Sequence, residues 1–264
     1  MRVDVRFGVA AVALILATGC DTIMGPTAPD ANWQQQTLGQ FTFYTRPGSF
    51  AEQHIGTFAE VLEDHIAYVR SRLDHAYTGH VTLFMHTSGA DAQFEGDAGN
   101  GDHSGVAYPD TETVKVAVVP PLDGNLFTLL AHEVTHVVVR NALGRPGTSF
   151  INEGSASALV SERRGAKGAS YSHAWVKQRL NQIPRLADLT DDERWRGFDQ
   201  PTSYTVSASF LSYLLDRFGA APFKSVYYAS SRDFAGSFRS AYGQSLEALE
   251  AEWRAFVAAR PDQP

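Results

Sequence analysis

One apolar stretch of the sequence carries two histidines and a glutamate at a spacing that suits an α-helix. His132, Glu133 and His136 lie within residues 126–140, which are otherwise mostly leucine, valine, alanine and phenylalanine. Residues four apart share a helix face, so both imidazoles can point at one metal ion, with Glu133 near a water on that metal. Polar groups in a buried helix need partners. We therefore predict a metal site; the alternative is a helix that carries two histidines by chance.

A third ligand is expected, because catalytic zinc usually has three protein ligands and one open position. Glu153 is the first candidate after His136. The sixteen residues between them suffice for one helix to end, a loop to turn and a second helix to begin. Gly154 would let these two helices approach closely. The alternative is that Glu153 is an acidic residue in the first turn of a helix, where the helix dipole favours it.

The N-terminus has the pattern of an export signal. Two arginines precede a 12-residue apolar run over residues 7–18, which is too short to span a bilayer. Small residues then lead to Cys20, the only cysteine. This resembles the lipobox of bacterial lipoproteins, in which the cysteine carries a lipid. The alternative is an ordinary secretory peptide cleaved near Ala17 or Gly19, which leaves a free thiol. A single cysteine excludes a disulfide within the chain.

These features predict a membrane-anchored, exported domain. Residues 1–19 are expected to be a signal peptide, and residues 20–37, with prolines and a glutamine run, a tether between the lipid on Cys20 and the domain. This places the domain in the bacterial cell envelope, on the periplasmic or extracellular side. The formal net charge of −7 argues against a nucleic-acid partner, which requires a basic surface.

Hydrophobic periodicity divides the rest of the chain into two lobes. Residues 38–147 predict a mixed α+β lobe that contains the metal helix, and residues 148–260 a mostly helical lobe that contains the third ligand. The first lobe is expected to have strands at 40–45, 81–85, 105–108 and 113–119, a long helix at 50–75 capped by Ser49, and a helical turn at 91–94. The second is expected to have helices at about 150–163, 169–183, 203–218, 221–229, 233–241 and 245–259.

Two local expectations concern the surroundings of the metal. Residues 105–108 are a candidate edge strand, to which a peptide could add as a further strand; an ordinary core hairpin is equally compatible. Residues 191–195 read as a polar loop, either beside the cleft or on the surface. His54, His65 and His75 are expected to be exposed or at the edge of the core, with no chemical role.

The two metal-ligand motifs together resemble the gluzincin metallopeptidases, in particular the bacterial peptidase-MA-like domains. Those chains typically have HExxH followed by a motif like Ile-Asn-Glu-Gly-Ser-Ala, as residues 151–156 have here. Stretches at 203–219 and 242–254 are also similar, so the resemblance covers residues 40–257. It implies a zincin-like α+β fold, one bound zinc ion, and hydrolysis of peptide bonds in peptide or protein substrates.

The resemblance also assigns roles to single residues. It implies that His132, His136 and Glu153 bind zinc and that Glu133 is the general base and later the acid. Tyr204 stands where related enzymes often have a tyrosine that donates to the oxyanion.

Two departures from the family pattern matter, and one of them is a ligand spacing a little shorter than in the best-known gluzincins. Ser157 replaces the acidic residue that orients a histidine in thermolysin-like enzymes, so that orientation is expected to come from elsewhere or to be weaker. Two other functions remain compatible with the sequence: a non-catalytic binding lipoprotein of the envelope, and a zinc hydrolase of a non-peptide substrate.

Overall fold

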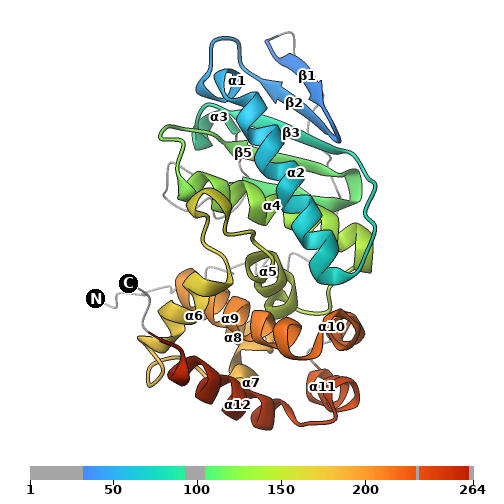
Figure 1. Cartoon of the computed structure of the whole chain (residues 1–264), viewed down its shortest axis with the longest axis vertical. Coiled ribbons are helices and arrows are strands. Elements are labelled where there is room, and N and C mark those ends of the chain that lie inside the picture. Colours follow the sequence, from blue (N-terminus) through green and yellow to red (C-terminus); the bar gives the residue numbers. More distant parts are fainter. Residues whose placement is uncertain (1–31, 93–104, 230–231, 262–264) are drawn as a thin grey trace, which may run out of the picture.

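The computed structural model describes residues 32–92, 105–229 and 232–261 (Figure 1). The expected signal peptide, the lipidation residue Cys20 and the tether up to residue 31 lie outside the described residues. None of the helices within the described ranges has the length and apolar character that crossing a bilayer requires.

A five-stranded mixed sheet forms the first lobe. Its strands are β1 (Gln34–Leu38), β2 (Phe41–Thr45), β3 (Val81–His86), β4 (Gly105–Tyr108) and β5 (Thr113–Ala117). They lie in the order β1-β2-β3-β5-β4, with parallel pairs at the centre and antiparallel pairs at both edges. The prediction that residues 105–108 form an edge strand is confirmed.

Strand β1 corrects the expected extent of the tether, which reached residue 37. Gln34, Gln35 and Gln36 pair with β2 although their side chains are exposed. An exposed polar edge strand has no hydrophobic alternation, so its sequence resembles that of a linker. The domain therefore begins earlier than residue 38.

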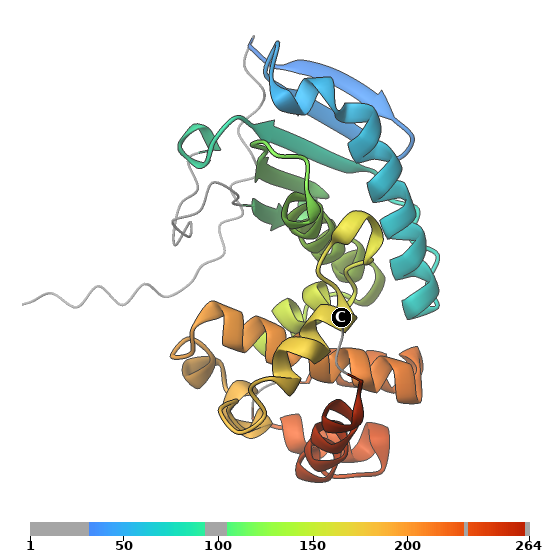
Figure 2. The same ribbon diagram turned by 60° about the vertical axis from the view of Figure 1, so that its left-hand side comes forward.

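Two long helices cover one face of this sheet (Figures 1 and 2). They are α2 (Ile55–Leu73) and α4 (Gly124–Leu143). The expected helix at 50–75 is broken at His54, so that a short helix α1 (Phe50–Gln53) precedes α2. The hydroxyl of Ser49 caps α1 as expected. Helix α3 (Gly89–Ala92) follows β3, close to the expected turn.

The second lobe is helical, as predicted. Its helices are α5 (Ser149–Ala158), α6 (Ala169–Lys177), α7 (Leu186–Leu189), α8 (Asp192–Trp195), α9 (Gln200–Phe218), α10 (Ala220–Tyr227), α11 (Phe234–Tyr242) and α12 (Leu246–Ala259). The short helices α7 and α8 were not expected. Helix α8 replaces the expected polar loop, and its Trp195 is buried.

The central contact of the helical lobe joins α5 to α9. A Cβ atom on Gly154 would lie 2.7 Å from Cβ of Ser207 and 2.9 Å from Cδ1 of Leu211. Gly154 thus permits a close helix approach, but its partner is α9 rather than the metal helix that we expected. The missing side chain lets α5 lie flat on α9.

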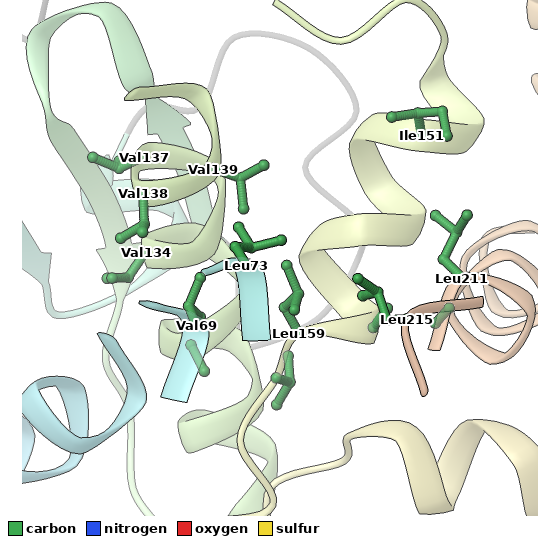
Figure 3. Close-up of a cluster of buried hydrophobic side chains, with 14 of the residues drawn as sticks. Val69, Leu73, Val134, Val137, Val138, Val139, Ile151, Leu159, Leu211 and Leu215 are labelled. Atoms are coloured by element: carbon green, nitrogen blue, oxygen red, sulfur yellow. The ribbon is translucent and has the colours of Figure 1, made fainter. Parts of the chain in front are cut away.

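One apolar core runs from the first lobe into the second. Figure 3 shows side chains from α2, α4, α5 and α9 in one buried cluster. Its labelled members are Val69, Leu73, Val134, Val137, Val138, Val139, Ile151, Leu159, Leu211 and Leu215. The helices that carry the candidate metal ligands therefore pack into the same core, which fixes one lobe against the other.

Two of the described histidines, His65 and His173, lie deep in this core. His65 on α2 is only 1% exposed, so the expectation that it lies at the surface or core edge is wrong. His173 on α6 is equally buried, and its Nδ1 lies 2.8 Å from Oγ of Ser209. Burial lowers the pKa of each imidazole to about 4, because an apolar environment disfavours the charged form.

These buried histidines predict a loss of stability in acid. At His173 the unfolded chain takes up a proton near pH 6.5, whereas the folded chain does so only near pH 4. The unfolded state binds more protons in this interval, so the free energy of unfolding falls as the pH is lowered, by about 3 kcal/mol at most for this residue. In urea titrations at several pH values, His173→Asn should show a smaller fall than the wild type. An unchanged fall would contradict the prediction.

Candidate active site

Helix α4 supplies two of the candidate metal ligands. The carboxylate of Asp123 caps its N-terminus by accepting from the backbone N–H groups of Asn125 and Leu126. The helix ends before Gly144, whose φ of +82° suits glycine. Most of its apolar side chains are buried, whereas His132 and His136 lie on a half-buried face directed at the second lobe.

Helix α5 brings Glu153 to this face. Oε2 of Glu153 lies 3.3 Å from Nε2 of His132 and 3.3 Å from Nε2 of His136, and the two Nε2 atoms are 3.1 Å apart. Tetrahedral coordination with bonds of about 2.0–2.1 Å separates ligand atoms by about 3.3 Å. The three groups therefore already have the spacing of ligands around one small ion, and they could hold a metal.

The two histidines of this candidate metal centre keep the carboxylate of Glu153 ionised. Burial alone would raise the pKa of Glu153, but the adjacent His136 and His132 hold it well below its usual range. Burial lowers the pKa of His136, and the charge of Glu153 with its hydrogen bond overcomes this and raises it to about 9. Glu153 is therefore negatively charged at neutral pH.

Neutral side chains contact the ligands through atoms other than the three that face the candidate metal centre. Oγ of Ser157 lies 3.2 Å from Nδ1 of His132, so the serine itself takes the place of the missing acidic residue. Nδ2 of Asn152 donates to Oε1 of Glu153 at 2.8 Å, and the same side chain hydrogen-bonds His136. This role of Asn152 was not predicted from the sequence. Its position directly before the candidate ligand Glu153 could have indicated it. These contacts leave the Nε2 atoms facing the centre.

Strand β4 holds Glu133. This carboxylate is 7% exposed and accepts a hydrogen bond from the backbone of Ala107. A Cβ atom on Gly105 would lie 2.8 Å from Cγ and 3.1 Å from Oε1 of Glu133. Burial raises the pKa of Glu133, and the two histidines and the bond from Ala107 partly offset that effect. The edge strand thus sets the position of the candidate general base.

Tyr204 completes the group of residues that the sequence suggested. It lies near the start of α9, and its ring stacks on His132 with centroids 5.8 Å apart. Its hydroxyl hydrogen-bonds Glu153, and burial together with the Glu153 charge raises its pKa, so the phenol stays protonated. The structure thus brings His132, Glu133, His136, Glu153 and Tyr204 together. The catalytic role of Tyr204 stays a prediction.

The carboxylates of Asp191 and Asp192 have local structural roles. Asp191 caps α8 by accepting from the backbone N–H groups of Glu193 and Arg194. Asp192 accepts from the backbone N–H of Ser149 at 2.7 Å, which joins α8 to the start of α5. These contacts support the helix that carries Glu153.

No family model matches the sequence, and no curated protein matches it. Among solved structures, native leukotriene A4 hydrolase from Saccharomyces cerevisiae has a TM-score of 0.50 at 14% identity, over 88% of this chain and 40% of that one. A second structure of the native yeast enzyme gives 0.48 at 16% identity, with the same coverage of both chains. The chain spans 40% of the length of these neighbours. At such identity the likeness shows the fold alone, which is α+β and zincin-like.

The contact between Ser157 and His132 makes a prediction about metal affinity. Ser157→Ala should weaken zinc binding by about tenfold, because an unsupported imidazole is less well oriented. Ser155→Ala is the matched control, since it removes a buried hydroxyl of the same helix that bonds to the backbone oxygen of Asn152. Competition with a chromophoric chelator measures both affinities. Equal affinities in the two variants would contradict this role of Ser157.

Proposed function

We propose that the chain is a zinc-dependent metallopeptidase of the gluzincin type. The observation that carries the proposal is the convergence of His132, His136 and Glu153, with the buried carboxylate of Glu133 beside them. Two imidazoles and one carboxylate form a zinc ligand set that leaves a position open for water or substrate. A glutamate directly after the first histidine is the arrangement of zinc hydrolases with a general base on the metal helix.

The chain's own residues can carry out amide hydrolysis. A bound zinc ion would supply a Lewis acid for the scissile carbonyl and a lowered pKa for water. Glu133 takes the proton from the attacking water and delivers it to the leaving nitrogen. The N–H of Ala107 holds the carboxylate during this transfer. Tyr204, which stays protonated, donates a hydrogen bond to the oxyanion.

The edge strand supports a peptide as the substrate. One side of β4 pairs with β5, and its other side pairs with no strand among the described residues. An extended peptide could add to this side by main-chain hydrogen bonds and would then lie beside Glu133. This feature favours a peptidase over a hydrolase of a non-peptide substrate.

The proposed place of action is the bacterial cell envelope. It rests on the apolar segment and small residues before Cys20. A lipid on Cys20 would leave a tether of about a dozen residues before β1. A non-catalytic binding lipoprotein is the second candidate for this location; the intact set of Glu133 and three ligands favours the enzyme.

Replacing the general base tests the function directly. Glu133→Gln should keep one zinc per chain and lose at least a hundredfold in activity, because the amide cannot accept the water proton. Glu153→Ala, in contrast, should lose both the zinc and the activity. Elemental mass spectrometry measures the metal, and digestion of a peptide mixture measures activity, with the exposed Glu193→Gln as control. A Glu133→Gln protein as active as the wild type would contradict the proposal.

The contact between β4 and Glu133 gives a second test. In Gly105→Ala the added methyl group would lie 2.8 Å from Cγ of Glu133 and must displace it. We expect activity to fall by about tenfold to a hundredfold with zinc content unchanged, because a misplaced base is a poor proton acceptor.

Gly56→Ala on α2 is the matched control, since its added Cβ has no neighbour within 4 Å among the described residues. Wild-type activity in Gly105→Ala would show that β4 does not set the position of the base.

A further inference from the structure

His65 on α2 lies against the flank of the metal helix that carries Ala131 and Thr135. Its Nε2 is 2.8 Å from the hydroxyl of Thr135, and the carbonyl of Ala131 also accepts from the ring. Its Nδ1 accepts from the backbone N–H of Ser161 at 3.4 Å. The imidazole on α2 therefore contacts two segments that are 70 and 96 residues away in sequence.

The hydrogen bonds fix the state of this ring. The hydroxyl of Thr135 donates to the carbonyl of Ala131 at 2.7 Å, so it must accept from Nε2–H of His65. Nδ1 must then be unprotonated in order to accept from Ser161. The ring is thus neutral with one defined tautomer, in agreement with the low pKa that burial gives it. Both ring nitrogens have a partner, as a buried polar group requires.

The two partners belong to the segments that carry the metal ligands. Thr135 directly precedes the ligand His136 on α4. Ser161 follows the last residue of α5, the helix of Glu153, by three positions. Apart from the contacts of Glu153 and Ser157 with the two histidines, these segments meet largely through apolar side chains, which resist separation better than sliding (Figure 3). A directional hydrogen-bonded bridge fixes the register that packing leaves loose.

We propose that His65 is a positioning residue that holds α4 and the end of α5 in the register at which His132, His136 and Glu153 meet. Its effect on the metal passes through Thr135 and Ser161, since its hydrogen bonds go to these residues and to Ala131 and not to a ligand side chain. This inference rests on the proposed metal centre and requires nothing of the peptidase activity.

The variants separate positioning from stability. His65→Leu removes every hydrogen bond of the ring, whereas His65→Gln keeps an N–H group that can reach Thr135. His173→Leu is the matched control: it removes a second buried neutral histidine, whose partners Ser209 and Phe256 lie in the helical lobe. Thermal unfolding reports stability in each variant. Zinc affinity and the visible spectrum of the Co²⁺-loaded protein, which depends on coordination geometry, report the metal centre.

We expect His65→Leu to weaken zinc binding by about tenfold and to change the Co²⁺ spectrum. His65→Gln should recover most of the affinity. His173→Leu should unfold at a lower temperature with an unchanged affinity and spectrum. If His65→Leu lowers only the unfolding temperature, as the control does, the inference is wrong and His65 serves stability alone.

A second pair of variants covers the case in which His65→Leu does not fold. Thr135→Val keeps the shape of the side chain but removes the acceptor for His65, and Thr135→Ser keeps the hydroxyl. The inference predicts weaker zinc binding in Thr135→Val alone, and equal affinities would overturn it. A wild-type chain that binds no zinc would overturn the proposed function together with this inference, whereas unaltered affinity in the variants would overturn the inference only.

Discussion

The approach of Glu153 to His132 and His136 is the contact on which the rest of the structure depends. Three half-buried polar groups meet beside the apolar core, where an unpaired charge is unfavourable. The fold tolerates them because each has a partner and because opposite charges share the site. The three groups can meet only if α5 has one particular position along the axis of α4. Packing of Gly154 on α9 fixes α5 from one side, and the bridge from His65 fixes it from the other.

Strand β4 links the centre to its expected substrate. Its backbone and its glycine hold Glu133, while the side of β4 that pairs with no described strand is where the proposed function places an extended peptide. The same four residues therefore set the distance between the base and any chain that adds to the sheet. A displacement of β4 would move the general base and the bound peptide together. The distance between the base and the peptide would therefore change less than the position of either one.

Periodicity and ligand spacing were sufficient to predict α4, the two lobes and the three candidate ligands, because these depend on local pattern. Contacts between distant segments were not predictable in the same way. Gly154 was expected to face α4 and instead faces α9, since sequence shows a missing side chain but not its neighbour. His65 shares the apolar face of α2 with Phe58, Leu62 and Val69, so the spacing of these residues could have predicted its burial. Its hydrogen-bond partners, 70 and 96 residues away in the sequence, could not be predicted in this way.

The partners behind the ligands are all neutral, and this explains why the centre needs so much geometric support. Ser157 and Asn152 orient His132, His136 and Glu153 without adding charge. Of the acidic residues that the structure brings to this site, Glu133 and Glu153 would balance a bound dication. A carboxylate in place of Ser157 would make the histidine more basic and bind the metal more firmly, at the cost of its power to polarise a carbonyl. With weaker electrostatic help, the ligands depend on rigid placement, which the bridge from His65 and the packing of Gly154 provide.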